Sequence, residues 1–211
     1  MLKAPKFWYQ SNFSILAILL LPLSLIWITG TYLKKKFAKP IRSKIPVIAI
    51  GSAIIGGSGK TPSVIYVCEI LEKIGYKPHV ISRGYGGSAN EVIKVSPDMS
   101  YSVVGDEAIM MSKYYPTWVS KNKYNAFAMA EKDGANILVL DDALQSYNIF
   151  KNLNIYVYDS IQSFGNKLIV PSGPLRESIS SVLNRSQIVF LVNTDNCLEI
   201  SKNKFQQNIN Y

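Results

Sequence analysis

The clearest chemistry in this sequence lies in "GGSGKT", Gly56 to Thr61, directly after the apolar stretch "IPVIAIG" at 45–51. Glycines let backbone N–H groups turn inward around phosphate oxygens. A lysine at this spacing can reach the β- and γ-phosphates of ATP, and a threonine hydroxyl can bind Mg²⁺. An incidental glycine-rich turn would share the letters. A strand before the loop and a helix after it favour a phosphate-binding loop.

The usual spacing, G-x-x-x-x-G-K-[ST], places a glycine where this chain has Ile54. We expect this replacement to cost little if Ile54 adopts an ordinary extended conformation. The predicted nucleotide-binding residues are Ile54, Ile55, Gly56, Gly57, Ser58, Gly59, Lys60 and Thr61.

A pair of acids ends the apolar run "ILVLDD" at 137–142. A P-loop enzyme keeps its Mg²⁺-side carboxylate at the carboxyl end of such a strand. An aspartate cap on a following helix is the alternative. The loop at 56–61 favours metal, so the predicted metal ligands are Thr61, Asp141 and Asp142.

A second acidic pair, Asp106 and Glu107, follows a glycine at the expected start of a helix. Carboxylates in that position stabilise the helix dipole, which is reason enough for their presence. The functional alternative is that Asp106 acts as a general base and takes a proton from an attacking hydroxyl group.

Two further glycine-containing turns carry arginines, "SRGYGG" at 82–87 and "PSGPLRE" at 171–177. In the first, the glycines would allow close approach of a ligand, Arg83 could pair with phosphate, and Tyr85 could stack or donate a hydrogen bond. The second sets Arg176 and Glu177 after a rigid turn. A plain turn remains the alternative for each.

Short apolar runs recur at 45–51, 77–84, 91–96, 136–142, 154–160 and 187–193, and several are continuous, as strands buried on both faces should be. Helical stretches are expected at 60–74, 106–115 and 123–133. Strand and helix in alternation predict an α/β fold, a P-loop NTPase-like parallel sheet flanked by helices.

The N-terminal segment carries most of the excess charge. Residues 1–44 hold eight of the 23 basic residues and none of the 14 acidic ones. Between the basic flanks, "FSILAILLLPLSLIWITGTYL" at 13–33 has no charged residue. The basic flanks fit a membrane-anchoring helix better than a cleaved signal peptide or a buried core helix. The domain that follows this helix is then expected to lie in the cytoplasm. Pro22 leaves a spanning helix and a kinked in-plane helix both open.

The same distribution bears on partners and compartment. A nucleic-acid binder would more often spread basic residues over its folded domain, so we expect anionic lipid and no nucleic acid. Two cysteines without metal spacing indicate a reducing compartment, and a single histidine, His79, excludes a histidine-cluster metal site. The sequence predicts no oligomeric state.

Taken in order, "GGSGKTP", "SRGYGG", "GDE", "DDALQ" and "SGPLRE" resemble the tetraacyldisaccharide 4′-kinases of the lipid A pathway. The resemblance implies a kinase at the cytoplasmic face of the inner membrane of a Gram-negative bacterium. Such enzymes transfer the γ-phosphate of ATP to the 4′-hydroxyl of a tetraacyldisaccharide 1-phosphate, the lipid A disaccharide precursor.

The resemblance also implies roles. Lys60 and Thr61 match the residues that bind ATP and Mg²⁺, Asp141 and Asp142 match the metal-side acids, and Asp106 matches the catalytic aspartate. Lys60 is therefore predicted as catalytic together with these three acids. Substrate-side positions are matched, or expected, at Arg83, Tyr85, Lys123, Gln145, Arg176 and Glu177.

Three departures separate the chain from the family pattern. Ser146 stands where a histidine usually follows the glutamine, and Lys123 stands where an arginine is usual. Family members also continue beyond the length of this chain, in a part that includes a histidine paired with the catalytic aspartate, and His79 does not match it. We therefore expect three regions: an anchor with a basic collar at 1–44, a P-loop kinase domain at 45–165, and the start of an incomplete second lobe at 166–211.

Two other functions remain open on the sequence alone. A truncated, membrane-tethered remnant would bind nucleotide without turnover. An unrelated membrane-bound P-loop ATPase would release phosphate without modifying lipid.

Overall fold

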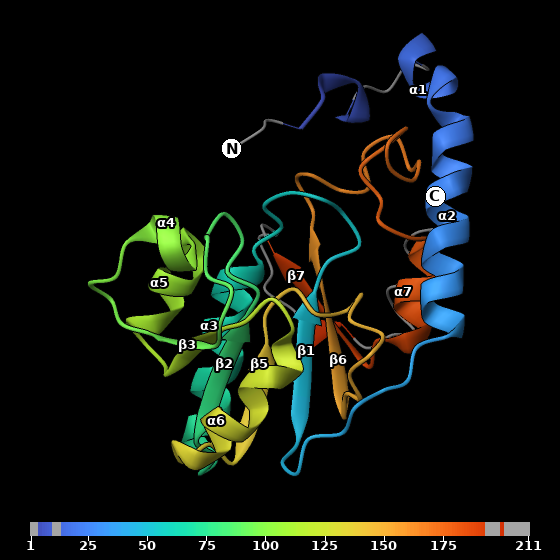
Figure 1. Ribbon diagram of the computed structural model, residues 1–211. Helices are drawn as coiled ribbons and strands as arrows, with labels where there is room; N and C mark the ends of the chain where they lie inside the picture. Colours follow the sequence, from blue (N-terminus) through green and yellow to red (C-terminus); the bar gives the residue numbers. More distant parts are fainter. Residues whose placement is uncertain (1–3, 10–13, 193–198, 201–211) are drawn as a thin grey trace. The chain divides into compact units, whose positions relative to one another are not determined.

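The computed structural model of the protein describes residues 4–9, 14–192 and 199–200 (Figure 1). Phe13, where the predicted apolar segment begins, and Asn193, where the last predicted strand ends, lie outside the described residues. So does most of the chain after Asn193. Contacts divide the chain into two compact units. The first unit comprises Met1–Lys39, Ser52–Gly59 and Tyr156–Tyr211, and the second comprises Pro40–Gly51 and Lys60–Ile155. The regions predicted from the sequence follow other boundaries and remain a prediction.

The second unit is built on a sheet with the strand order β3-β4-β2-β5-β1. Adjacent strands run parallel except for the edge pair β3 and β4, which is antiparallel. Figure 1 shows β2, β5 and β1 standing next to one another. The strands are β1 (Val47–Gly51), β2 (Pro78–Ser82), β3 (Ile93–Val95), β4 (Thr117–Val119) and β5 (Ile137–Leu140).

Burial explains why these segments form strands. Every residue of β1, β2, β4 and β5 is buried. Parallel strands covered on both faces read as continuous apolar runs, and that is the pattern the sequence carries. The predicted α/β class with a mostly parallel sheet is therefore confirmed in this unit.

The helices of the second unit are α3 (Lys60–Lys73), α4 (Tyr101–Val104), α5 (Asp106–Ser112), the 3-10 turn η2 (Lys123–Ala126) and α6 (Phe127–Lys132). In α3, Val64, Val67, Cys68 and Leu71 are buried at helical spacing, which fixes the face that packs inward. The helix is closed by Gly75, whose positive φ of 90° suits the turn that follows a helix.

The first unit contains η1 (Lys6–Tyr9), α1 (Ile15–Leu19), α2 (Leu21–Lys36), α7 (Ile179–Arg185), β7 (Ile188–Val192) and β8 (Glu199–Ile200). Strand β6 (Leu153–Asp159) begins in the second unit and ends in the first. Strands β7 and β8 pair in the antiparallel sense.

The apolar run predicted as a single N-terminal helix is two helices in the part of the chain that the structure describes. Helix α1 ends before Leu20 and α2 begins directly after it. Pro22 explains the break, because its missing N–H cannot continue the hydrogen-bond pattern of α1, whereas it is tolerated in the first turn of α2. Among the described helices, none is both long enough and apolar enough to cross a membrane.

The remaining sequence predictions had mixed outcomes. Strands β1, β2, β5, β6 and β7 and helix α3 lie where they were expected. The strand expected at 91–96 is present as β3, but it pairs with β4 in the antiparallel sense, so the expectation of a parallel sheet was wrong at this edge. The helix expected at 123–133 is divided between η2 and α6, and β4, α4 and α7 were missed.

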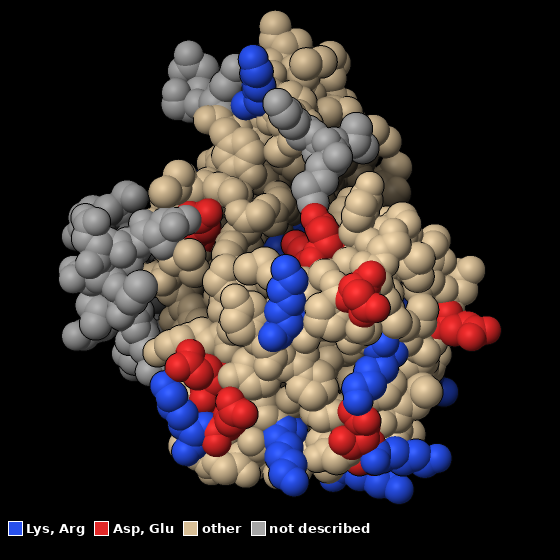
Figure 2. All heavy atoms as spheres, turned by 90° about the vertical axis from the view of Figure 1, so that its left-hand side faces the viewer, with Lys and Arg blue, Asp and Glu red and all other residues tan. Residues whose placement is uncertain are grey.

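Figure 2 shows that basic and acidic side chains are interspersed on one face of the molecule.

The central strand β5 generates a stability prediction. Leu140 is fully buried, so Leu140→Ala should lower the free energy of unfolding by about 2–5 kcal/mol through lost burial and a residual cavity. Denaturant unfolding followed by circular dichroism would measure this. The matched control is Ile74→Ala, at a side chain 64% exposed, which should change stability by less than about 0.5 kcal/mol. Equal effects of the two variants would contradict the assigned core.

Candidate active site

The site in the second unit is organised by the carboxyl ends of β2 and β5. These strands are parallel neighbours with Ile81 opposite Leu140, so their last residues reach the same edge of the sheet. The amide of Asp141 donates to the carbonyl of Ile81 at 3.0 Å, which holds the residue after β5 against β2. Ligands of open α/β sheets bind outside this edge.

Asp141 is a buried carboxylate, with only 2% of its surface exposed. Its Oδ2 accepts a hydrogen bond from Ser82 Oγ at 2.9 Å, while Oδ1 has no hydrogen-bond partner among the described residues. Burial raises the pKa of Asp141, and the negative charge of Asp142 raises it further. The oxygen Oδ1 is a polar atom that calls for a partner beyond the described protein atoms.

Two buried lysines offset this charge. Lys60, the first residue of α3, and Lys123, in η2, both lower the pKa of Asp141, and Lys123 does so more strongly. Lys123 Nζ also donates to the backbone carbonyl of Asp142 at 3.4 Å. Asp141 and Asp142 lie in a turn after the strand, and Asp142 has a positive φ of 46°.

The acidic pair that begins α5 faces the same charges. Burial raises the pKa of Glu107, and Asp141 raises it further, while Lys60 lowers it. The side chain of Asp106 is exposed, and its Oδ1 accepts a hydrogen bond from the backbone amide of Glu107 at 3.0 Å. The helix start therefore sets one carboxylate among the buried charges and leaves the other open to solvent.

Glycines bring this helix start against the turn at 82–87. A Cβ on Gly87 would lie 2.4 Å from the carbonyl oxygen of Val103, and one on Gly105 would lie 2.5 Å from that of Tyr85. Backbone hydrogen bonds from 88 and 89 to 102 and 103 continue the contact. The glycines of the 82–87 turn were expected from the sequence to allow close approach of a ligand. The structure shows that Gly87 makes room for a neighbouring segment of backbone.

The other predicted residues of this unit differ in exposure. Tyr85 is 76% exposed and Arg83 is also exposed, so both side chains are open to solvent. Gln145 is half-buried in the turn after the acidic pair, and Thr61 is buried beside Lys60 at the start of α3. Their assignment to substrate or metal remains a prediction.

The first half of the phosphate loop belongs to the first unit. Ile54 forms an isolated antiparallel bridge with Leu175, so its backbone is extended, as the sequence analysis required for a residue in place of glycine. Gly56 and Gly59 have positive φ values of 129° and 71°. A Cβ on Gly59 would lie 2.8 Å from a methyl group of Val192, so this position needs glycine for two reasons.

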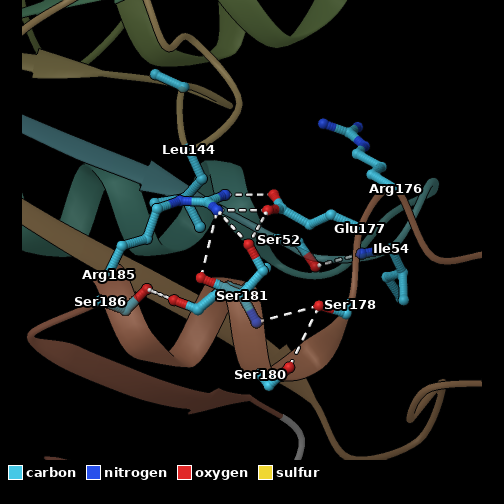
Figure 3. A network of polar contacts seen from close by, with 12 residues as sticks. Ser52, Ile54, Leu144, Arg176, Glu177, Ser178, Ser180, Ser181, Arg185 and Ser186 are labelled. Carbon is cyan, nitrogen blue, oxygen red and sulfur yellow. Dashed lines mark hydrogen bonds and ion pairs between the residues drawn. The ribbon is translucent and has the colours of Figure 1, made fainter. Parts of the chain in front are cut away.

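Arg176 and Glu177 also lie in the first unit. The carboxylate of Glu177, 5% exposed, forms a bidentate ion pair with Arg185 and accepts a hydrogen bond from Ser181 Oγ at 3.0 Å (Figure 3). In Figure 3 no dashed line joins the side chain of Arg176 to this ion pair. Glu177 is thus engaged within the protein, which favours a positioning role over the substrate contact predicted from the sequence.

The single histidine occupies the other end of β2. His79 is buried, its Nδ1 accepts a hydrogen bond from Trp118 Nε1 at 3.2 Å, and burial lowers its pKa. Asp133 forms an ion pair with Lys94 at 2.6 Å, and its Oδ2 lies 3.8 Å from His79 Nδ1. This environment accounts for the histidine structurally, whereas Ser82, at the carboxyl end of the strand, contacts Asp141.

Two residues of this site were missed from the sequence. Ser82 was read only as the start of a turn, and Glu107 only as a helix-start carboxylate beside Asp106. Ser82 could have been found because it ends the strand next to the one that ends in two aspartates. Glu107 carried no separate signal, since only the packing of α5 reveals that its charge interacts with Asp141 and Lys60.

Within the described ranges, no group of three or more His, Cys, Asp or Glu side chains is arranged to hold a metal ion. The predicted set, with two carboxylates and one hydroxyl, would therefore be incomplete alone. Mg²⁺ commonly takes one or two protein carboxylates and completes its shell with phosphate oxygens and water.

Comparisons with known proteins show similarity to one family. The family described as "Tetraacyldisaccharide-1-P 4'-kinase" matches residues 16–210. Proteins named tetraacyldisaccharide 4′-kinase are 39% identical in Psychromonas ingrahamii, over 89% of this chain and 60% of the relative, and 35% identical in Rhodospirillum centenum, over 92% and 59%.

A solved structure is similar as well. The crystal structure of LpxK from Aquifex aeolicus in complex with ATP superposes with a TM-score of 0.75 at 26% identity, covering 85% of this chain and 59% of that one. The chain thus spans about three-fifths of the length of the curated relatives it matches.

The environment of Asp141 generates a pH prediction. Its pKa is raised in the folded protein, so the unfolded state gives up this proton at a lower pH than the folded state. This carboxyl therefore makes stability fall as pH rises above the ordinary aspartate pKa of about 3.9. We expect Asp141→Asn to raise the free energy of unfolding at pH 7, by about 1.4 kcal/mol per unit of the raised pKa.

Urea unfolding at pH 7 and pH 4, without nucleotide or metal, measures this difference. The gain from Asp141→Asn should shrink at pH 4. Asp98→Asn is the control, because that carboxyl is exposed and its pKa is lowered by Ser96. A loss of stability in Asp141→Asn at pH 7 would show that the buried charge is fully compensated.

Proposed function

The chain belongs to the tetraacyldisaccharide-1-phosphate 4′-kinase family, and from this premise we propose that it transfers the γ-phosphate of ATP to the 4′-hydroxyl of a tetraacyldisaccharide 1-phosphate in lipid A biosynthesis. The observation that carries the proposal is the buried carboxylate of Asp141, placed with Lys60 and Lys123 at the carboxyl edge of the sheet. A phosphoryl-transfer site needs this combination of fixed cations and a metal-side acid.

The phosphate loop and the start of α3 would hold the nucleotide. Backbone amides of the loop surround phosphate oxygens, and the N-terminus of α3 adds a positive end to the helix dipole. Lys60 neutralises charge that develops on the transferred group, and Lys123 keeps the acidic pair in place through the carbonyl of Asp142. These groups are fixed before the reaction, so little reorganisation is needed.

The residues also fit Mg²⁺. Asp141 Oδ1 is buried and has no hydrogen-bond partner in the described part of the chain, so a cation would satisfy it. Asp142 and Thr61 would supply further oxygen ligands, and phosphate oxygens would complete the set. When bound, Mg²⁺ would neutralise negative charge on the phosphates of ATP.

Asp106 is the proposed acceptor of the proton. In the transfer, the 4′-hydroxyl oxygen forms a bond to the γ-phosphorus while the bond from that phosphorus to the ADP oxygen breaks. The hydroxyl proton passes to the Asp106 carboxylate, which is exposed and therefore accessible to an incoming substrate. Glu107, the half-buried neighbour of Asp106, adds negative charge to the group formed by Asp141 and Lys60. It does not pass protons to solvent in this scheme.

A direct assay tests the proposal. The purified chain should move labelled γ-phosphate from ATP to tetraacyldisaccharide 1-phosphate. Lys60→Ala should lower the rate by roughly 100-fold or more, since it removes a fixed charge from the transition state. Asp106→Asn should lower it by about 100- to 10,000-fold through loss of the base.

Lys73→Ala, at the exposed end of α3, is the control and should leave the rate unchanged. Two other outcomes would identify different functions. ATP binding without labelled product would indicate a nucleotide-binding protein that does not turn over. Phosphate release without labelled lipid would indicate an ATPase.

We further propose that the N-terminal helices bind the cytoplasmic face of the bacterial inner membrane. Exposed apolar side chains line α1 and α2, and α2 ends in Lys34, Lys35 and Lys36. The most exposed of the apolar side chains are Ile15, Leu19, Leu25, Ile26 and Phe37. An apolar helix with a basic end suits an anionic lipid surface, and a substrate with four acyl chains stays in the bilayer.

Vesicle binding tests this proposal. Ile26→Glu, at a side chain 69% exposed, should weaken binding to vesicles of phosphatidylcholine and phosphatidylglycerol by roughly tenfold or more. High salt should weaken binding of the unchanged chain by screening the lysines. Ile74→Glu, an exposed apolar site in the second unit, is the control. If it weakens vesicle binding as much as Ile26→Glu does, the proposal that these helices bind the membrane is wrong.

A further inference from the structure

The segment 169–177, called the strap here, pairs with the first half of the phosphate loop through its backbone. The amide of Ile55 donates to the carbonyl of Pro174 at 2.9 Å, and the amide of Arg176 donates to the carbonyl of Ala53 at 2.7 Å. These two bonds flank the bridge between Ile54 and Leu175. The loop residues that precede the glycines are therefore held as a short strand.

The strap is itself fixed on its other side. The amide of Leu175 donates to the carbonyl of Leu168 at 3.1 Å, and the amide of Val170 donates back to the carbonyl of Leu175 at 2.9 Å. Residues 174–176 thus lie between residues 53–55 and residues 168–170. Most of the strap is buried, so these bonds are shielded from water.

Helix α2 contacts the strap with its polar side chains. Trp27 Nε1 donates to the carbonyl of Arg176 at 2.9 Å. Ser24 Oγ lies 2.8 Å from both the carbonyl of Ile169 and the hydroxyl of Ser172. Ser24 is the buried residue of a helix whose apolar side chains are largely exposed. Arg176 therefore joins α2, through its carbonyl, to the phosphate loop, through its amide.

The far end of the strap is held by the ion pair between Glu177 and Arg185 of α7 (Figure 3). Ser178 caps the same helix by accepting a hydrogen bond from the amide of Ser181 at 3.2 Å. Fixed at α7 and at α2, the strap has little freedom to shift relative to these helices. A change in how α2 lies on the strap would consequently shift the backbone of residues 53–55.

We propose that the strap is a positioning device for the phosphate loop, and that Ser24 and Trp27 are positioning residues through which α2 keeps the loop in its ATP-binding conformation. This inference rests on the proposed nucleotide-binding function of the loop. It gives α2 a second task besides lipid contact, and it explains how the loop is held without the usual first glycine.

The test compares Trp27→Phe, which removes the N–H donor and keeps an aromatic ring, and Ser24→Ala with the unchanged chain. Amide hydrogen exchange at Ile55 and Arg176 should become about three- to tenfold faster, and the dissociation constant for a fluorescent ATP analogue with Mg²⁺ should rise by about the same factor. Thr29→Val is the matched control, because the Thr29 hydroxyl donates within α2, to Leu25, at 2.8 Å.

Ser24→Thr keeps the hydroxyl and should restore both readouts. The proposal is overturned if exchange at the two amides in Trp27→Phe and Ser24→Ala equals that in Thr29→Val, or if affinity falls without faster exchange. The fluorescence of the ATP analogue with Lys60→Ala gives the background signal in the absence of specific binding. If the unchanged chain gives only that signal, the proposed function fails, and exchange at Ile55 and Arg176 alone then decides whether the strap is held by α2.

Discussion

A carboxylate that is almost fully removed from water must be offset by nearby charge or by protonation, and Asp141 imposes this constraint on the second unit. Its position follows from the parallel pairing of β2 and β5, because that pairing sets Ser82 beside it. Lys60 and Lys123 supply the positive charge, and both are themselves buried. Removing either lysine would leave the buried carboxylate with less compensating charge.

Elements near this cluster are closely packed. The α5 helix start approaches the turn at 82–87 through positions where only glycine fits, and Glu107 then adds its charge to the group.

In the first unit, the strap holds the phosphate loop by backbone hydrogen bonds that do not depend on the identity of Ile54. An isoleucine in place of the usual glycine is therefore compatible with the loop, because the position needs an extended backbone.

Much of this arrangement could be predicted from local sequence. The glycine-rich loop before α3, the apolar runs of β1 and β5 and the two aspartates after β5 each carry a signal within a few residues. These features depend on short-range patterns that strands and helices impose. The family resemblance, and not a local pattern, drew attention to Lys123, whose Nζ donates to the carbonyl of Asp142 in the structure.

What the sequence did not reveal depends on contacts between distant residues. The partner of Glu177 is Arg185, and the partners of Ser24 are some 145 residues away, so no spacing rule points to either. Strand β4 was missed although β3, which is equally short, was expected; β4 is identified by its pairing with β2 and β3. The break at Leu20 could have been predicted from Pro22. The role of the polar side chains of α2 is evident only from their hydrogen bonds to the strap.

The most direct test of the account is the Mg²⁺ dependence of ATP affinity, measured by calorimetry in Mg²⁺ and in EDTA for the unchanged chain and for Asp141→Asn. If Asp141 Oδ1 faces the metal that accompanies ATP, Mg²⁺ should tighten ATP binding to the unchanged chain and should have little effect on the variant. An equal Mg²⁺ effect in both proteins would contradict the assignment of this buried carboxylate to a nucleotide–metal site.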